Sequence, residues 1–305
     1  MRTLTYYLSL LVLVFAVWSC GKSTSADAEG EADSTAVVKE QPAATPLFPD
    51  TPGIQTYSFR ASFARDVANA LDTIKHLGFT EVECGLDPYG LTTEEFKKML
   101  DDRGIKATSV GAGYDQIVEN PEEVAQKANI MGAKYVMVAW IPHKDAFTID
   151  DAKKAVEDFN RVGKVLKENG VTLCYHNHGY EFVPYEDGTL FDYIAENTDP
   201  EYVSFEMDIL WVTHPGADPV QLLEKYGNRW KLMHLKDLRA GVPSDFSGHT
   251  PVENDVVLGT GVIDIPAVLK AAKKAGVEHY YIEDESPTVG EQVPQSLEYL
   301  KGLTE

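Results

Sequence analysis

From about residue 52 onward, the chain alternates between two patterns of apolar positions. Short runs rich in β-branched and aromatic residues are followed by longer segments whose apolar residues recur every three or four positions. The short runs predict strands at 53–59, 81–85, 105–110, 134–140, 171–177, 203–209, 231–236 and 279–284. The longer segments predict amphipathic helices, most clearly at 93–102, 121–131, 150–169, 219–226 and 265–275.

This alternation predicts right-handed βαβ units and a parallel sheet. Eight strands spread over about 250 residues favour a single α/β domain, a closed (β/α)8 TIM barrel, over an open doubly wound sheet. A glycine stands between a predicted helix and the next strand at Gly78, Gly104, Gly132, Gly170 and Gly276, where helix C-cap glycines are expected. The segment Gly259-Thr260-Gly261 has no nearby lysine or helix-capping pattern, so we interpret it as a turn rather than a phosphate-binding loop.

The first 51 residues do not share this alternation. Arg2 precedes an apolar run over 8–18, which is shorter than the ~20 residues of a membrane span and suits a signal peptide. The following VWSC resembles a bacterial lipobox, which predicts a lipoprotein signal peptide over 1–20 with lipidation at Cys20. A plain secretory signal with an incidental cysteine is the alternative. Residues 21–51 predict a disordered acidic tether, and 52–305 the barrel.

Charge and cysteine content narrow the partners and the compartment. The chain has 48 acidic and 27 basic residues, a net charge of −21, and phosphate backbones repel such a surface. We therefore expect no nucleic-acid partner and contact with a membrane only through the lipid anchor. The predicted location is the periplasm or outer membrane of a Gram-negative bacterium. Cys84 and Cys174 are expected to be buried and unpaired.

Four predicted strands end in residues that bind metals. They finish as His176-Asn177-His178, Glu206-Met207-Asp208, His234-Leu235-Lys236 and Glu283-Asp284-Glu285. The carboxyl ends of barrel strands carry the active site, and alternate residues of a strand share a face. Each residue taken singly could be a helix cap, a salt-bridge partner or a core histidine. Burying them together without a cation is costly, so we predict one divalent ion, of Mn, Co, Zn or Fe type.

Four stretches of the chain resemble the xylose isomerase-like TIM barrel family, which includes sugar phosphate isomerases and epimerases. They are LCYHNHGYEF (173–182), SFEMDILWV (204–212), KLMHLKDL (231–238) and LGTGVIDIPAVLKAAKKAGVEHYYIEDE (258–285), within a resemblance that covers about 52–303. The resemblance implies that the metal ligands are His176, Asp208, His234 and Glu283. Many relatives, including ketose epimerases, have a glutamate in place of His176 and use it as one of two acid–base groups. A histidine there looks more like the branch of inosose dehydratases and 3-keto-glycoside lyases.

The expected function is therefore that of a metal-dependent sugar isomerase, epimerase or lyase that removes a proton next to the carbonyl of a keto-sugar or keto-glycoside. His178, Glu181 and Lys236 are the candidate catalytic residues. The candidate substrate contacts are Glu83, Tyr57, Trp140, His143 and Trp211, for which a salt bridge or rim packing is the alternative role. We interpret the remaining histidines of the barrel's second half, His214, His249 and His279, as structural or surface residues.

Two other functions compete with this one. An apurinic endonuclease shares the barrel but needs several zinc ligands and a basic face, and the net charge of −21 argues against it. A non-catalytic carbohydrate-binding lipoprotein on the same barrel stays open, because metal ligands alone do not establish turnover.

Overall fold

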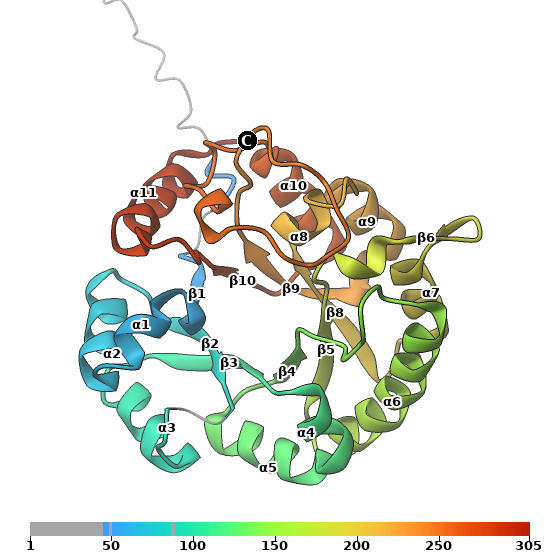
Figure 1. Ribbon diagram of the computed structural model, residues 1–305. Coiled ribbons are helices and arrows are strands. Elements are labelled where there is room, and N and C mark those ends of the chain that lie inside the picture. The colour runs from blue at the N-terminus through green and yellow to red at the C-terminus, as the bar shows by residue number, and fades with distance from the viewer. Residues whose placement is uncertain (1–44, 49–50, 87–88) are drawn as a thin grey trace, which may run out of the picture. The chain divides into compact units, whose positions relative to one another are not determined.

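The computed structural model describes residues 45–48, 51–86 and 89–305. Eight parallel strands close into a barrel in the order β1-β10-β9-β8-β5-β4-β3-β2, and helices surround them (Figure 1). The barrel strands are β1 (Gly53–Gln55), β2 (Glu81–Gly85), β3 (Lys106–Gly111), β4 (Tyr135–Val138), β5 (Thr172–His176), β8 (Val203–Asp208), β9 (Trp230–Leu235) and β10 (His279–Ile282). A short antiparallel pair, β6 (Pro184–Tyr185) and β7 (Gly188–Thr189), lies outside the barrel. The predicted single (β/α)8 barrel is confirmed.

The helices begin and end close to the predicted positions. They are α1 (Arg60–Phe63), α2 (Val67–His76), α3 (Thr93–Asp101), α4 (Tyr114–Glu119), α5 (Pro121–Met131), α6 (Ile149–Glu168), α7 (Leu190–Asn197), α8 (Ile209–Thr213), α9 (Pro219–Tyr226), α10 (Ile265–Ala275) and α11 (Val289–Gly302). The five predicted C-cap glycines all have positive φ, as that role requires. The first strand ends at Gln55 instead of residue 59, because Thr56–Phe59 forms a 3-10 turn capped by the Gln55 side chain.

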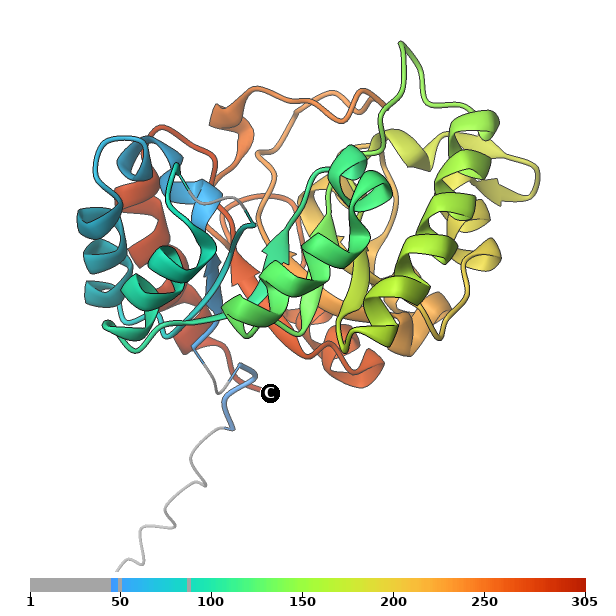
Figure 2. The ribbon, with the colours of Figure 1, turned by 90° about the horizontal axis from the view of Figure 1, so that it is seen from below.

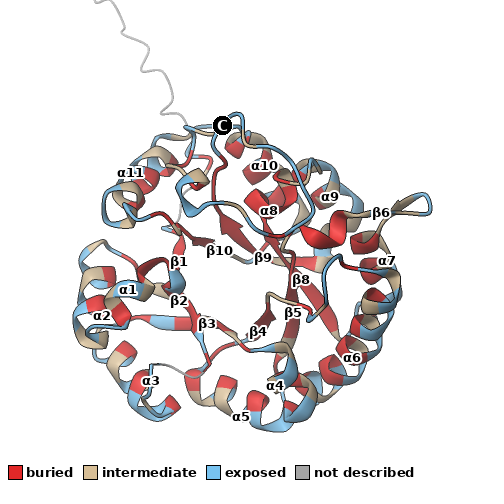
Figure 3. Cartoon of the chain, viewed as in Figure 1, coloured by how far each residue is buried: buried red, intermediate tan, exposed pale blue. Residues whose placement is uncertain are grey.

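The inward face of the barrel is built in layers. Figure 3 shows that burial is concentrated on the strands and on the inner faces of the helices. A buried layer of Tyr135, Cys174, Leu232 and Tyr281 forms a cluster of its own. Three of these residues stand two positions before His176, His234 and Glu283 on the same strands, so they lie directly below those side chains. Cys84 and Cys174 are both buried and free, as predicted.

The barrel domain begins before the predicted boundary at residue 52. Leu47 is buried in the core, and its N–H donates to the carbonyl of Leu303 at 2.9 Å. Pro46 pairs with Thr304 in an antiparallel bridge, and the N–H of Glu305 donates to Thr45. The tether predicted over 21–51 is therefore wrong for 45–48, since a buried leucine and two strand-like pairings fix this segment. It lies at the end of the barrel opposite to the β9–α10 loop (Figure 2).

The predicted signal peptide over 1–20, its Cys20 and most of the tether lie outside the described residues. Within the part of the chain that the structure describes, no helix is both long enough and apolar enough to cross a membrane.

Candidate metal centre

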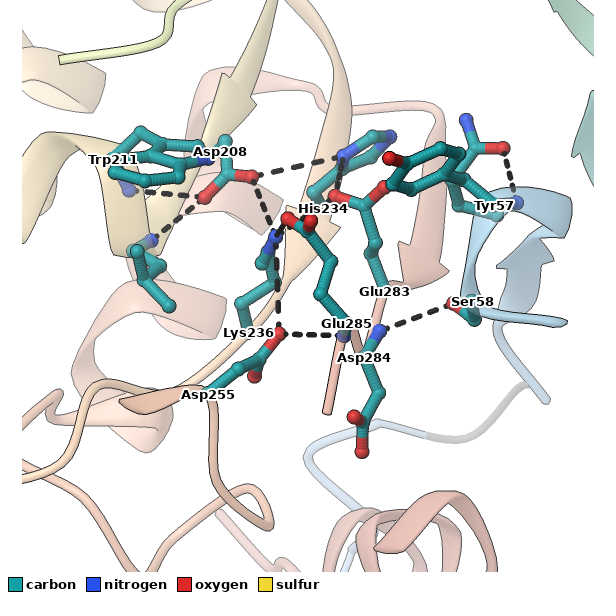
Figure 4. Close-up of polar contacts among 12 residues, drawn as sticks. Tyr57, Ser58, Asp208, Trp211, His234, Lys236, Asp255, Glu283, Asp284 and Glu285 are labelled. Atoms are coloured by element: carbon teal, nitrogen blue, oxygen red, sulfur yellow. Dashed lines mark hydrogen bonds and ion pairs between the residues drawn. The ribbon is translucent and has the colours of Figure 1, made fainter. Parts of the chain in front are cut away.

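Four side chains from neighbouring strands converge at the carboxyl end of the barrel. His176 ends β5, Asp208 ends β8, His234 lies in β9, and Glu283 follows β10. His234 Nδ1 lies 3.2 Å from Glu283 Oε2 and 3.8 Å from Asp208 Oδ2, and His176 Nε2 lies 3.8 Å from the same Asp208 oxygen. Figure 4 shows three of these side chains facing one another. Ligand atoms around a four-coordinate ion with ~2.1 Å bonds are about 3.4 Å apart, so these spacings suit one ion.

The two carboxylate oxygens of Asp208 have different environments. Oδ1 accepts the N–H groups of Leu210 at 2.9 Å and Trp211 at 3.0 Å, and so caps the first turn of α8. Oδ2 is buried and has no hydrogen-bond partner. The backbone of Asp208 is fixed by the Asn177 amide, which donates to its carbonyl and accepts from its N–H. An oriented, desolvated carboxylate oxygen facing two imidazoles is what a cation site requires.

Two further carboxylates, Glu83 and Glu206, lie behind the imidazoles. Glu83 is hydrogen-bonded to His234 Nε2 and Glu206 to His176 Nδ1. His176, Glu206 and His234 could also surround an ion on that inner side. However, neither glutamate lines the cavity, whereas His176 and His234 do. The set formed by His176, Asp208, His234 and Glu283 is therefore the one nearer the cavity, because three of its four members line it.

Burial and neighbouring charges set the ionisation of the centre. Burial lowers the pKa of His176 well below its usual value, so this imidazole is neutral. Burial also opposes ionisation of Glu283, but Lys236 and His234 outweigh it and hold the pKa of Glu283 well below the usual range. For His234, burial acts downward, yet Glu206 and Glu283 raise its pKa well above the usual value. Without a metal, ionised Asp208 and Glu283 are thus balanced by the cationic His234 and the Lys236 ammonium group. A metal ion bound through His234 Nδ1 would replace a proton of that ring.

Lys236 is buried among carboxylates beside the four convergent side chains. Its Nζ donates to Glu283 Oε2 at 3.0 Å and to Glu285 Oε1 at 2.7 Å, and lies 3.8 Å from Asp255 Oδ2 (Figure 4). Asp255 also accepts the N–H of Glu285, so the β9–α10 loop and the end of β10 are joined here. An amine with two short bonds to carboxylates is held as an ammonium ion, which is a proton donor.

The centre opens into a cavity of about 630 Å³. One wall is aromatic: the His178 ring stacks on Trp211 at 4.7 Å between centroids, and Trp140 packs edge-on against His178 at 5.2 Å. His249 stacks on Trp140 at 5.4 Å. Tyr57, which is 50% exposed, stands at the rim. A cavity of this size, with ligands at one end and rings along one wall, suits a sugar-sized molecule or a glycoside.

The structure brings most of the predicted site residues to this cavity, but not all. His178, Lys236, Tyr57, Trp140 and Trp211 line it, together with three of the four metal-ligand candidates, His176, His234 and Glu283.

Four predicted site residues of the barrel do not line the cavity. Asp208 joins the metal-ligand candidates from the end of β8, and the other three lie elsewhere. Glu181 is fully buried behind the β5–α7 loop, where it accepts from Tyr175 Oη and from the His178 N–H, so it is out of reach of a substrate. Glu83 contacts His234 and does not line the cavity. His143 stacks on Trp140 and bonds the Ile141 carbonyl, also outside the lining.

Several residues of the site were not predicted from the sequence. His249, interpreted as a structural or surface residue, lines the cavity. So do Asp255, Glu285 and Tyr89. No local signal marks His249 or Asp255, because both come from the long loop between β9 and α10, whose path depends on tertiary packing. Glu206 was recognised as sharing a face with Asp208, but its contact with His176 follows only from the register of β5 and β8.

The Gly259-Thr260-Gly261 segment is organised around one buried carboxylate. The side chain of Asp237 accepts the N–H groups of Gly259, Gly261 and Ile263 at 2.9 to 3.1 Å. The donors that a phosphate would need are thus occupied, which agrees with the interpretation as a turn.

A barrel with a cluster of candidate metal ligands at the carboxyl ends of β5, β8, β9 and β10 defines a class, and comparison with known proteins identifies the family. Residues 71–303 match the profile described as "Xylose isomerase-like TIM barrel". The chain belongs to this family.

The similar proteins are sugar-modifying enzymes. The inosose dehydratase of Geobacillus thermodenitrificans is 29% identical over 233 residues, which are 67% of this chain and 77% of the relative. Inosose dehydratase 2 of Bacillus cereus is 26% identical over 257 residues, 75% of this chain and 85% of the relative. A solved sugar phosphate isomerase/epimerase from Parabacteroides distasonis superposes with a TM-score of 0.66 at 27% identity, covering 88% of this chain and 97% of that one.

A solved IolI protein with a bound zinc atom has the same fold, with a TM-score of 0.65 at 15% identity, covering 83% of this chain and 95% of that one.

Proposed function

We propose that this protein is a divalent-metal-dependent enzyme that removes a proton next to the carbonyl of a keto-sugar and eliminates the substituent on the following carbon. A 3-keto-glycoside is the substrate that fits best, which makes the enzyme a lyase. The observation that carries the proposal is the convergence of His176, Asp208, His234 and Glu283 at one end of a cavity that His178 and Lys236 also line. The similar inosose dehydratases support an elimination on a sugar-like ketone.

A divalent ion held by these four side chains would polarise the substrate carbonyl as a Lewis acid. His178 is placed to accept the proton, because its ring lines the cavity and is held by stacking on Trp211. The C–H electron pair then forms the new C=C bond as the leaving group departs. Lys236 is placed to donate a proton to that leaving oxygen. Return of the proton to the neighbouring carbon would instead give an isomerase.

The charge of the cavity favours an uncharged substrate. Lys236 is the one lysine among the lining residues, no arginine lines the cavity in the described part of the chain, and Glu283 and Glu285 already bind the ammonium group. A phosphate group would find no cation of its own and would face carboxylates. Glycosides without a phosphate are therefore better candidates than sugar phosphates.

Oxidised glucosides test this proposal directly. The protein loaded with Mn²⁺ or Co²⁺ should release the aglycone. Unreacted substrate recovered from heavy water should carry deuterium next to the carbonyl, because the abstracted proton can return before the leaving group departs. The His178→Ala variant should lower kcat by about 10²–10⁴-fold, the usual contribution of a positioned acid or base. His279→Ala is the matched control, because His279 lies at the opposite end of the barrel against Glu81. If the purified protein bound no metal in stoichiometric amount and the substrate exchanged no hydrogen for deuterium, the proposal would be refuted and a binding protein would be favoured.

We also propose that the enzyme acts outside the cytoplasm as a lipoprotein anchored at Cys20. The support is the apolar run over 8–18 followed by VWSC. Radiolabelled palmitate should be incorporated into the wild-type chain expressed in a Gram-negative host and not into Cys20→Ser. Equal labelling of both chains would contradict the anchor.

A further inference from the structure

Two carboxylates that no substrate can touch lie directly behind the metal-ligand histidines. Glu83 of β2 and Glu206 of β8 are both 0% exposed. Glu83 Oε1 lies 2.7 Å from His234 Nε2, and Glu206 Oε2 lies 3.1 Å from His176 Nδ1. Neither carboxylate lines the cavity. Their position gives them no part in binding or converting a substrate, so their contacts with the histidines need another explanation.

The two histidines present opposite nitrogens to the cavity side. His234 directs Nδ1 toward Asp208 and Glu283, while its Nε2 faces Glu83. His176 directs Nε2 toward Asp208, while its Nδ1 faces Glu206. An imidazole that binds a metal carries one N–H and one lone pair, so the nitrogen that donates inward determines which nitrogen is free to bind an ion. Each carboxylate thus selects the tautomer that a metal on the cavity side needs.

The environment of the carboxylates agrees with this role. Glu83 Oε1 also accepts the Gln55 amide at 2.6 Å, which fixes the carboxylate against the imidazole. The Glu83 and Glu206 side chains are hydrogen-bonded to histidine and glutamine and form no ion pair with lysine or arginine within the described ranges. Among these hydrogen-bond partners, the two imidazoles are therefore the groups that can carry a positive charge.

We propose that Glu83 and Glu206 are positioning residues, which hold His234 through Nε2 and His176 through Nδ1 so that the other nitrogen of each ring binds the ion. This inference rests on the metal site of the proposed function and adds the groups that orient it. Partners of this kind typically contribute 10–100-fold to metal affinity.

Binding of Co²⁺ alone tests the inference without any substrate. Co²⁺ affinity is measured by competition with a chelator, and the visible absorption of the bound ion reports the geometry of its ligands. We expect Glu83→Met and Glu206→Met each to weaken Co²⁺ binding about 10–100-fold and to change the absorption spectrum. Glutamine at either position can still accept the imidazole N–H through its amide oxygen, so Glu83→Gln and Glu206→Gln should restore part of the affinity.

The matched control is Glu81→Gln. Glu81 lies two residues before Glu83 on the same face of β2 and bonds His279 Nδ1 at 2.8 Å, so it is also a glutamate–histidine pair, but at the other end of the barrel. The Glu81→Gln variant should therefore keep the wild-type Co²⁺ affinity and absorption spectrum. If the methionine variants fail to fold, the glutamine variants decide by the same two measurements. Wild-type affinity and spectrum in folded Glu83 and Glu206 variants would overturn the inference, whereas failure of the wild-type protein to bind Co²⁺ would overturn the proposed metal site itself.

Discussion

Glu181 shows how a residue that looked catalytic acquires a structural role. Its Oε1 accepts the Tyr175 hydroxyl and the His178 N–H, both at 2.8 Å, while Oε2 is buried without a partner. Burial raises the pKa of Glu181 to about 7, against which these hydrogen bonds act only in part. The carboxyl group therefore supports the loop that carries His178, and ionising it at neutral pH weakens the fold.

This gives a pH dependence of known sign. The folded-state pKa of Glu181 is raised from 4.5 to about 7, so the folded protein holds the proton more tightly than the unfolded chain. Its contribution to stability is complete below pH 4.5 and is lost as the pH rises to about 7. The unfolding free energy of Glu181→Gln minus that of wild type should therefore be about 2 kcal/mol larger at pH 8 than at pH 5. Urea unfolding at both pH values measures this difference, and a difference that stays constant would contradict the burial argument.

At the scale of single residues, the sequence shows which potential metal-binding side chains stand at the ends of the predicted strands. The set His176, Asp208, His234 and Glu283 was expected from the resemblance to the xylose isomerase-like family. Strand periodicity alone only grouped each of them with a second polar residue two positions away. Glu181 could not be excluded from the sequence, since two residues of loop separate it from His178 and their path is set by tertiary contacts. His249 carries no local signal, because its partner Trp140 belongs to a distant loop.

At the scale of elements, the β9–α10 loop, residues 236–264, completes the site. Its base is fixed by the buried carboxylate of Asp237, and its middle reaches the β5–α7 loop at Gly248. Gly248 has φ of +68°, and a Cβ there would lie 2.9 Å from the His178 carbonyl oxygen. The two loops that carry His178 and His249 thus meet through a glycine that leaves no space for a side chain.

Gly248→Ala should therefore impair the site more than the fold. The methyl group must displace the loop from His178, and this displacement moves His249 away from Trp140. We expect kcat/KM for a keto-glycoside to fall by at least about 10-fold, because small misplacements near the reacting atoms are costly. Gly241→Ala is the matched control: it lies in the same loop at φ of +80° with nothing within 4 Å of the added atom. Both variants bear the left-handed strain of about 1–2 kcal/mol. Equal losses of kcat/KM in the two variants would show that backbone strain, not the contact, is responsible.

Regular elements were predicted far better than loops, for a physical reason. Apolar periodicity records which side of a strand or helix faces the core, and so α5, α9 and α10 were predicted to the residue. The first strand was predicted too long because Thr56–Phe59 continues its apolar pattern while turning over the barrel mouth. Loop residues carry no such periodicity, and the contacts that bring Gly248 and His249 to the site are with segments distant in sequence.

At the scale of the whole molecule, the segment 45–48 is part of the barrel domain. Leu47 is 4% exposed, and Phe48 packs edge-on against Tyr280 at 5.2 Å between ring centroids. We expect Leu47→Ala to cost about 2–3 kcal/mol in unfolding free energy, as for other buried leucines. Urea unfolding checks this, with the exposed Thr51→Ala as control.

Truncation provides an independent check on the same boundary. A chain that begins at Thr45 should unfold like the full-length protein, whereas one that begins at Pro52 should lose at least as much stability as Leu47→Ala. Equal stability of the two truncated chains would place the boundary at residue 52 after all.

The order of strands around the barrel affects how the substrate specificity of this protein can evolve. The four side chains assigned to the ion come from β5, β8, β9 and β10, which are consecutive neighbours in the closed sheet. The other arc, β1 to β4, and the turns that follow it contribute Tyr57, Tyr89 and Trp140 to the opening. Substitutions of these rim residues, unlike substitution of Glu83 on the same arc, can alter which molecule is admitted while the cation-holding arc stays intact. New specificities can thus evolve on one half of the ring without rebuilding the reaction chemistry on the other.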